Sequence, residues 1–338
     1  MVSIKDLAKY VGVSISTVSR ALNDYSDVNE ETRKKIKKAA IELGYRPSKN
    51  ARDLALKRKN NMAVIVSGLG SNNPMDEFTG NILRGIFDYM HTYDITVAMY
   101  AISSELQKQQ SLEDFCREYG LDGVILVGMK IEDEYVLQAG KSSIPCVAID
   151  VLIEGGKVAC VLTDDEKAFR EITEYSLSKF LDKIILIKGK EEAQVTHARL
   201  KGFKSALKKY NLRYEDVDVI DCRFDEDEAY IKTKDYLDNF KDTRGRLFIC
   251  MSDLMAIAVV RAIQDSGYRV PEDFSVTGFD GIHLLNYIKP RITTINQNTR
   301  RKGYIGMKLL SGLMNGEIQK SIVYIEHQLL EGESEKLL

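Results

Sequence analysis

Two kinds of hydrophobic pattern divide this chain near residue 61. Before that point, apolar residues recur every three or four positions, a spacing typical of short amphipathic helices. After it, short β-branched runs alternate with amphipathic helical stretches, which is typical of βαβ units around a parallel sheet. The pattern predicts a small all-α head, residues 1–47, and a larger α/β body, residues 62–338, joined by residues 48–61.

The head has the pattern of a helix-turn-helix. Ser3 can cap a first helix and Ser14 a second, and Gly12 lies between them, where a left-handed residue would let the chain turn. In that motif the second helix lies in the major groove of DNA. An ordinary helical hairpin with a solvated polar face would fit the same residues. A third helix, capped by Asn29 and running to Gly44, would close a three-helix core.

The body is long enough for two lobes, because domains typically hold about 100 to 200 residues. The expected strands include residues 63–66, 96–99, 123–126, 147–149, 184–187, 217–220, 247–249 and 275–277. The expected helices include residues 82–91, 106–118, 168–179, 200–210, 229–240 and 254–266. Two doubly wound lobes would accommodate these units, with a ligand in the cleft beside the carboxyl ends of the strands.

The charge distribution separates the two parts further. Residues 1–60 contain fourteen Lys and Arg against seven Asp and Glu, a net charge of +7. Residues 61–338 contain 34 basic and 43 acidic residues, a net charge of −9. A basic head on an acidic body indicates an anionic partner that binds at one end, although charge alone does not separate DNA from RNA or a membrane surface.

The remaining composition predicts a cytoplasmic protein without cofactor or metal. No apolar run reaches the roughly 18 residues of a membrane helix, and the first six residues lack the features of a secretory signal. The five cysteines are odd in number and lie mostly in apolar runs, so we expect reduced core residues. The four histidines are scattered without metal-ligand spacing.

Two other classes of function fit less well. An enzyme would need a site motif, but Gly68-Leu-Gly70 lacks the third glycine of a dinucleotide fingerprint, and Gly189-Lys190 lacks the upstream glycine of a phosphate-binding loop. A kinase or dehydrogenase is therefore only a fold-level alternative. A free sugar-binding protein of a transporter would have the same body, but it would need export and would not need a basic head.

The first 60 residues resemble the DNA-binding head of the lactose and galactose repressor family of bacterial transcription regulators. The matching segments are Ile4-Lys-Asp-Leu-Ala8, Gly12-Val-Ser14, Thr17-Val-Ser-Arg20, Asn23, Glu31-Thr-Arg33, Leu43-Gly-Tyr-Arg-Pro47 and Ala51-Arg-Asp-Leu54. The resemblance implies base contacts by Ile15, Ser16, Arg20 and Leu54. It implies phosphate contacts by Ser3, Thr17, Ser19, Asn23, Tyr45 and Arg52.

The resemblance also gives residues 48–61 a role as hinge helix and linker. In the family this segment folds only when two subunits meet on operator DNA. By position, Leu54 is then the apolar wedge that enters the minor groove and kinks the duplex. The alternative is that Leu54 is a simple linker hydrophobe.

The body resembles the periplasmic sugar-binding-protein fold that these repressors use as a sensor, with landmarks such as Arg199-Leu-Lys-Gly-Phe203 and Gly278-Phe-Asp280. The resemblance implies effector contacts by Phe78, Asp164, Arg199, Ser252 and Asp280. An arginine fork and an aspartate acceptor suit sugar hydroxyls. Asp164-Asp165 stands where many members have Asp-Asn, and Ser252 where many have Asn, so the resemblance does not identify the ligand. Alternatively, Arg199 and Asp280 only bridge two loops.

Together these features predict a DNA-binding repressor of carbohydrate-metabolism genes. It would act as a homodimer on a near-palindromic double-stranded operator. A small-molecule effector, a sugar or sugar derivative, would control operator affinity. The sequence leaves open whether the effector releases or strengthens DNA binding and which genes are regulated.

Overall fold

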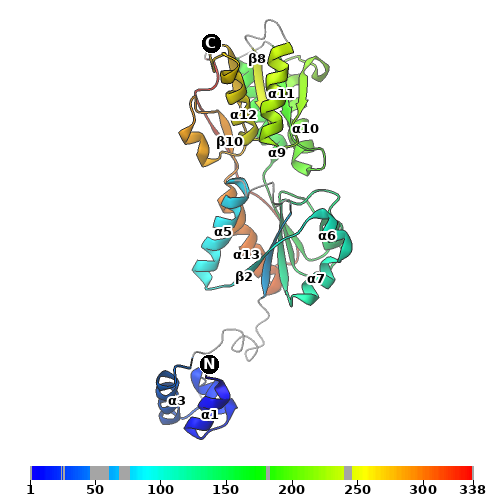
Figure 1. The fold of residues 1–338 in the computed structure, drawn as a ribbon. Coiled ribbons are helices and arrows are strands. Elements are labelled where there is room, and N and C mark those ends of the chain that lie inside the picture. The colour runs from blue at the N-terminus through cyan, green and yellow to red at the C-terminus, as the bar shows by residue number, and fades with distance from the viewer. Residues whose placement is uncertain are drawn as a thin grey trace. The chain divides into compact units, whose positions relative to one another are not determined.

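A computed structural model describes residues 2–23, 25, 27–45, 61–67, 77–179, 183–239 and 246–336 (Figure 1). The chain divides into two compact units, Met1–Lys59 and Asn60–Leu338, here called the head and the body. Of the expected hinge and linker, residues 48–61, only Asn61 lies within the described residues.

The head contains three helices: α1 Ile4–Val11, α2 Ile15–Leu22 and α3 Glu30–Glu42. Ser3 and Asp6 form a capping box at the start of α1, and Gly12 ends that helix with φ 76°, as the turn requires. The Oγ of Ser14 accepts the N–H of Thr17 at 3.0 Å and so caps α2. The core that joins the helices consists of Leu7, Ala8, Val18, Ala21, Val28, Ile36, Ala39 and Ala40.

The first lobe of the body is built on a six-stranded parallel sheet with the order β11-β5-β4-β3-β1-β2. Its strands are β1 Met62–Val66, β2 Val97–Ala101, β3 Gly123–Val127, β4 Cys146–Ile149, β5 Val158–Leu162 and β11 Ser321–Tyr324. One face packs against α7 Leu112–Glu118 and α8 Glu134–Ala139, and α6 Ser104–Gln109 contacts α8. The other packs against α5 Glu77–Tyr93 and α13 Thr299–Met314.

The second lobe has a four-stranded parallel sheet with the order β7-β6-β8-β9. Its strands are β6 Ile184–Lys188, β7 Asp218–Asp221, β8 Arg246–Cys250 and β9 Phe274–Thr277. Its helices are α9 Asp165–Lys179, α10 Gln194–Lys209, α11 Glu226–Asn239 and α12 Asp253–Asp265. The antiparallel pair β10 Thr294–Asn296 and β12 Gln328–Leu330 completes it.

The described chain crosses between the lobes after β5, after β10 and after β11. Crossings of this kind let two rigid lobes move about a few residues. The two doubly wound lobes agree with the sequence-based expectation.

One helix expected from the sequence is two helices in the structure. The stretch 106–118, expected as a single helix, is divided into α6 and α7 at Gln110, whose backbone is extended. The Oγ of Ser111 accepts the N–H of Asp114 at 3.1 Å, so a local cap starts a new helix where hydrophobic spacing alone predicts continuation. The five cysteines are buried and free, as predicted, and burial raises the pKa of the Cys116 thiol to about 12.

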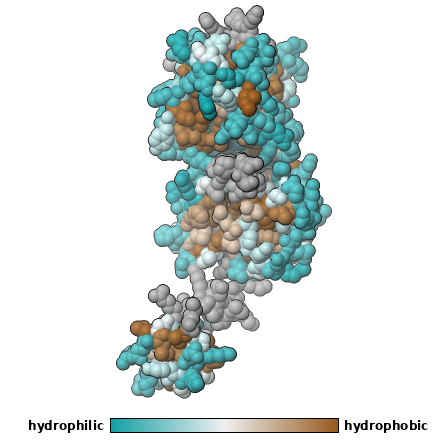
Figure 2. Space-filling model, in the orientation of Figure 1, coloured by the Kyte–Doolittle hydropathy of each residue, from teal (hydrophilic) through white to brown (hydrophobic). Residues whose placement is uncertain are grey.

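Exposed hydrophobic side chains gather on one face of the first lobe, over α5 and β2 (Figure 2). Phe87 and Tyr93 on α5 are 51% and 55% exposed, and Met99 on β2 is 46% exposed. Strand β2 is also an edge of the six-stranded sheet, with unpaired backbone groups on one side.

Helices α5 and α13 approach so closely that their contact depends on two glycines. A Cβ added at Gly85 would overlap the carbonyl oxygen of Arg300, and a Cβ added at Gly303 would overlap that of Ile82. At Gly80, in the first turn of α5, an added Cβ would meet nothing within 4 Å.

We expect Gly85→Ala to lower the free energy of unfolding by about 1–3 kcal/mol or more, because the helices must separate to admit a methyl group. Gly80→Ala on the same helix should instead raise it by up to about 1 kcal/mol, because alanine reduces the freedom of the unfolded chain. Chemical denaturation of the full chain, followed by circular dichroism, measures both. Equal effects of the two substitutions would contradict the close approach.

Candidate functional site

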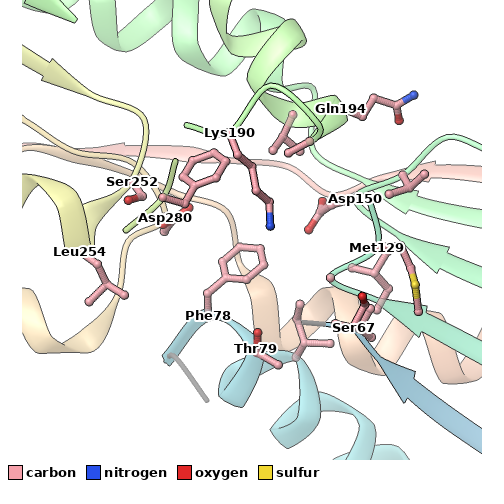
Figure 3. Close-up of a pocket in the computed structure, with 18 of the residues that line it drawn as sticks. Ser67, Phe78, Thr79, Met129, Asp150, Lys190, Gln194, Ser252, Leu254 and Asp280 are labelled. Atoms are coloured by element: carbon pink, nitrogen blue, oxygen red, sulfur yellow. The ribbon is translucent and has the colours of Figure 1, made fainter. Parts of the chain in front are cut away.

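A cavity of about 230 Å³ lies between the lobes of the body, at the carboxyl ends of their parallel strands (Figure 3). Asp150 follows β4 in the first lobe, and Lys190 and Ser252 follow β6 and β8 in the second. Parallel strands bring their carboxyl ends to one edge, so side chains from distant segments converge here. Most other lining residues are apolar, and a few polar groups in an apolar cavity are typical of a small-molecule site.

Four of the five residues expected to bind an effector line this cavity: Phe78, Arg199, Ser252 and Asp280. Asp164 does not line it. Its side chain is exposed, and its Oδ1 accepts the N–H of Lys167 at 3.0 Å at the start of α9. The neighbouring Asp165 is the buried one of the two.

Arg199 is held by its own lobe. Its Nε donates to Oδ1 of Asp165 at 2.8 Å, and its Nη1 donates to the carbonyl oxygen of Met251. Its guanidinium lies 4.0 Å from the ring centroid of Phe279, and its Nη1 lies 3.9 Å from Oδ1 of Asp280. Burial raises the pKa of Asp165, and the charge of Arg199 opposes that rise. Arg199 therefore bridges loops and also lines the cavity. A structural role in bridging loops is thus compatible with a role in effector binding.

From Asp280 the contacts continue into the first lobe. Oδ1 of Asp280 accepts a hydrogen bond from Nε2 of Gln297 at 2.7 Å. Oε1 of Gln297 in turn accepts a hydrogen bond from Nζ of Lys302 at 2.7 Å. Lys302 is fully buried, and its Nζ also donates to Oδ1 of Asp150 at 2.5 Å. We call the series Asp165, Arg199, Asp280, Gln297, Lys302 and Asp150 the interlobe chain.

Four further hydrogen bonds join the lobes at the edges of the cleft. The carboxylate of Glu77 on α5 accepts the N–H groups of His283 and Leu284 at 2.6 and 3.1 Å. The N–H of Ile131 donates to the carbonyl of Glu192 at 3.0 Å. The N–H of Leu152 donates to Oε1 of Gln194 at 2.6 Å. Any opening of the cleft must break these bonds.

Sequence reasoning missed several polar residues of the cleft. Asp150 directly follows an expected strand, and that position was a usable signal. In the sequence, Lys190 stands out only as part of an incomplete phosphate-binding motif. Gln297 and Lys302 carry no local signal, because their roles depend on partners in another segment.

In the head, the residues of α2 that are expected to contact bases are exposed. Val18 and Ala21 are buried, whereas Ile15, Ser16 and Arg20 are exposed. The guanidinium of Arg20 pairs with the carboxylate of Asp27, and both side chains are about half exposed. Because that pair is solvated, its exchange for a base edge costs little.

The expected phosphate-contacting residues have varied surroundings. Ser3 caps α1, and Thr17 bonds to Ser14 through its hydroxyl at 2.8 Å. Ser19 is half-buried, and its carbonyl accepts Nδ2 of Asn23 at 2.8 Å. Tyr45 packs against the head core. The two remaining predicted DNA contacts, Arg52 and Leu54, lie outside the described residues.

Across the described ranges, no group of three or more His, Cys, Asp or Glu side chains is arranged to hold a metal ion. None of the described helices combines the length and the apolar character needed to span a membrane.

Two family models match the chain. One, described as bacterial regulatory proteins of the lacI family, matches residues 3–48. The other, described as a periplasmic binding protein-like domain, matches residues 173–334. The chain is also 30% identical to the transcriptional repressor PurR of Photobacterium profundum over 311 residues, which cover 92% of this chain and 91% of that one.

Two solved structures share the architecture. A Lac repressor dimer bound to operator and the anti-inducer ONPF has a TM-score of 0.85 at 24% identity, covering 98% of each chain. A complex of the transcriptional regulator CelR with cellobiose has a TM-score of 0.72 at 25% identity, covering 99% of this chain and 100% of that one.

We expect Arg199→Ala to lower the free energy of unfolding of the full chain by about 3–5 kcal/mol, because Asp165 is then buried without its cation. Adding Asp165→Asn should recover part of that loss. The exposed Lys201→Ala on the same helix is the control and should change stability little. Urea denaturation measures all three variants.

The loss should also depend on pH. Without the positive charge of Arg199, nothing from that residue opposes the effect of burial, so the pKa of Asp165 rises further. A buried acid with a raised pKa destabilises the fold only while it is ionised. The difference between Arg199→Ala and the parent should therefore shrink as the pH falls from 7 to 5. A difference that stays constant, with no recovery in the double variant, would show that the buried carboxylate is not its cause.

Proposed function

This chain belongs to the LacI family of bacterial regulatory proteins, and we propose that it represses carbohydrate-metabolism genes by binding operator DNA as a homodimer under the control of a small-molecule effector. It is a transcriptional regulator with a helix-turn-helix head and a periplasmic-binding-protein-like body. The observation that carries the proposal is α2, which is capped at Ser14, anchored by Val18 and Ala21, and exposed along Ile15, Ser16 and Arg20. We further propose that it acts in the cytoplasm and has no enzymatic activity.

Base recognition is assigned to the exposed face of α2. Arg20 would exchange its contact with Asp27 for the two acceptors of a guanine, because a guanidinium can donate to both at once. Ile15 and Ser16 would contact neighbouring base edges. Ser3, Thr17, Ser19, Asn23, Tyr45 and Arg52 would hold phosphates and so fix the position of α2 without reading sequence.

We expect Arg20→Ala to weaken operator binding by about 1–3 kcal/mol and to remove the preference for guanine at one position in each half-site. Selection of bound sequences from a random DNA pool measures the base preference, and affinity measurements on the selected site give the loss of binding free energy. Lys38→Ala on α3 removes the same charge from an exposed position and should leave base preference unchanged. If Arg20→Ala weakened all sequences equally, Arg20 would be a phosphate contact instead.

The homodimer is supported by the apolar face of the first lobe. Phe87, Tyr93 and Met99 are exposed there, and β2 offers an open sheet edge. Large exposed apolar patches usually mark interaction sites, and a two-fold partner would also supply the second head that a palindromic operator needs. The Lac repressor in the similar solved structure is a dimer.

We expect Phe87→Glu to convert the protein from dimer to monomer, because a charge would be buried without a partner in the interface. Sedimentation velocity at micromolar concentration measures the change. Leu137→Glu, at an equally exposed apolar residue on α8, should remain dimeric. A dimeric Phe87→Glu variant would exclude this face as the interface.

The effector is proposed to bind in the interlobe cavity at Phe78, Arg199, Ser252 and Asp280. Asp164 remains a proposed contact only if its exposed side chain turns when a ligand binds. The CelR relative of similar structure is bound to cellobiose, which favours a sugar or sugar derivative. A ligand that touches both lobes changes the balance between open and closed clefts.

Movement of the first lobe would reach the linker directly. Asn61 donates its N–H to Oδ2 of Asp122 at 3.1 Å and its Nδ2 to the carbonyl of Gly120 at 3.0 Å, so the end of the linker is fixed to that lobe. In a dimer, the separation of the two linkers would then follow the lobes. We propose that this separation controls whether residues 48–61 can fold on DNA with Leu54 in the minor groove.

A further inference from the structure

One cation that lines the interlobe cavity, Lys190, makes no ion pair with a described residue. The side chain of Lys190 is half-buried and extends into the space near Phe78 and Asp150 (Figure 3). Within the described residues, the ion pairs around the cleft use Lys188, Arg199 and Lys302, and none uses Lys190. Burial and the ammonium of Lys130 lower the pKa of Lys190, and the carboxylates of Glu192 and Asp133 oppose that shift at longer range.

The carboxylates that line the cavity already have partners. Oδ1 of Asp150 is bound by the buried Lys302. Asp280 accepts the amide of Gln297 and lies 3.9 Å from the guanidinium of Arg199. Each of these two acids therefore already binds a group of the protein, and neither forms an ion pair with Lys190. A buried ammonium without a partner is costly, so a neutral ligand that excluded water would be opposed at this position.

The start of α10 adds to the positive potential near Lys190. Ala193, Gln194 and Val195 line the cavity, and Ala193, at the N-cap position, has no side chain able to cap the helix. The first N–H groups of a sixteen-residue helix carry partial positive charge and favour an anion. This helix end supports the argument from Lys190 because both belong to the same wall of one cavity.

We propose that the effector is a carbohydrate that carries an anionic group, a phosphate ester or a carboxylate, and that the ammonium of Lys190 binds this group. The inference rests on the proposed function, since it names the ligand class of the same cavity. The anion would make a charge-assisted hydrogen bond with Lys190. The uncharged part of the ligand would lie against Phe78, and Oδ2 of Asp150, which is buried without a hydrogen-bond partner, would accept a sugar hydroxyl.

The experiment is a thermal-shift screen of the full chain followed by calorimetric titration of every compound that stabilises it. The probes are matched sets: neutral glucose, fructose, ribose and cellobiose; glucose 6-phosphate, fructose 1-phosphate, fructose 6-phosphate and ribose 5-phosphate; and gluconate and glucuronate. Inorganic phosphate serves as the control for the anion alone. Comparison of the phosphate and carboxylate sets identifies the source of the negative charge.

We expect an anionic probe to bind at least tenfold more tightly than its neutral parent. Lys190→Gln should remove at least tenfold of that affinity, and Lys190→Arg should restore most of it because the charge is kept. Lys208→Gln, which removes a charge from the exposed far end of the same helix, should bind like the parent.

The outcomes separate the two proposals. If a neutral sugar binds most tightly and Lys190→Gln does not weaken it, the anionic effector is wrong while sugar sensing stands. An anionic probe whose affinity is unchanged in Lys190→Gln would also overturn the role of Lys190. If no compound in any set binds, sugar sensing fails together with the inference.

Discussion

Two buried cations and their counter-charges set the geometry of the body. Arg199 and Lys302 are almost completely removed from solvent, and each is compensated by carboxylates contributed from a different segment. Removing one member of such a set leaves a buried charge unpaired, which costs several kcal/mol, about 3–5 by analogy with other proteins. The crossings after β5 and β10 must therefore keep a position that satisfies all of these contacts. The interlobe chain fixes where the two lobes meet and so where a cavity can form.

In a regulator, the contacts between the lobes should be stable at the centre of the interface and able to break and reform at the edges of the cleft. The bonds made by Glu77, Ile131 and Leu152 across the cleft are few and exposed or half-exposed, so water can replace them when the lobes separate. The interlobe chain lies at the crossings, where little movement is required. A ligand held by both lobes would strengthen the edge contacts without rebuilding the centre. Coupling energies of about 1–3 kcal/mol are sufficient for regulation of this kind.

The head solves a different physical problem. Its helices are only eight to thirteen residues long and would be marginal in isolation. Caps at Ser3, Ser14 and Asn29 satisfy their first N–H groups, and a core of small aliphatic residues brings them together. Because these caps and this core hold the three helices together, the outer face of α2 is not needed for the stability of the head. Arg20 and its neighbours can therefore be chosen for DNA contacts alone, while the sensing chemistry resides in the body.

The sequence by itself determined the helix-turn-helix, the alternation of strands and helices, and Arg199 and Asp280 as cavity residues. Caps, turns and hydrophobic periods act between neighbours in the chain, and the family motifs are local as well. Only the tertiary structure decided that Asp165 is buried while Asp164 is exposed, and that the stretch 106–118 is divided into two helices at Gln110. It also decided that Lys302 meets Asp150, 152 positions away, and that Lys190 faces the cavity without an ion pair to a described residue. Electrostatic pairing depends on distance in space, and the fold alone sets that distance for residues far apart in sequence.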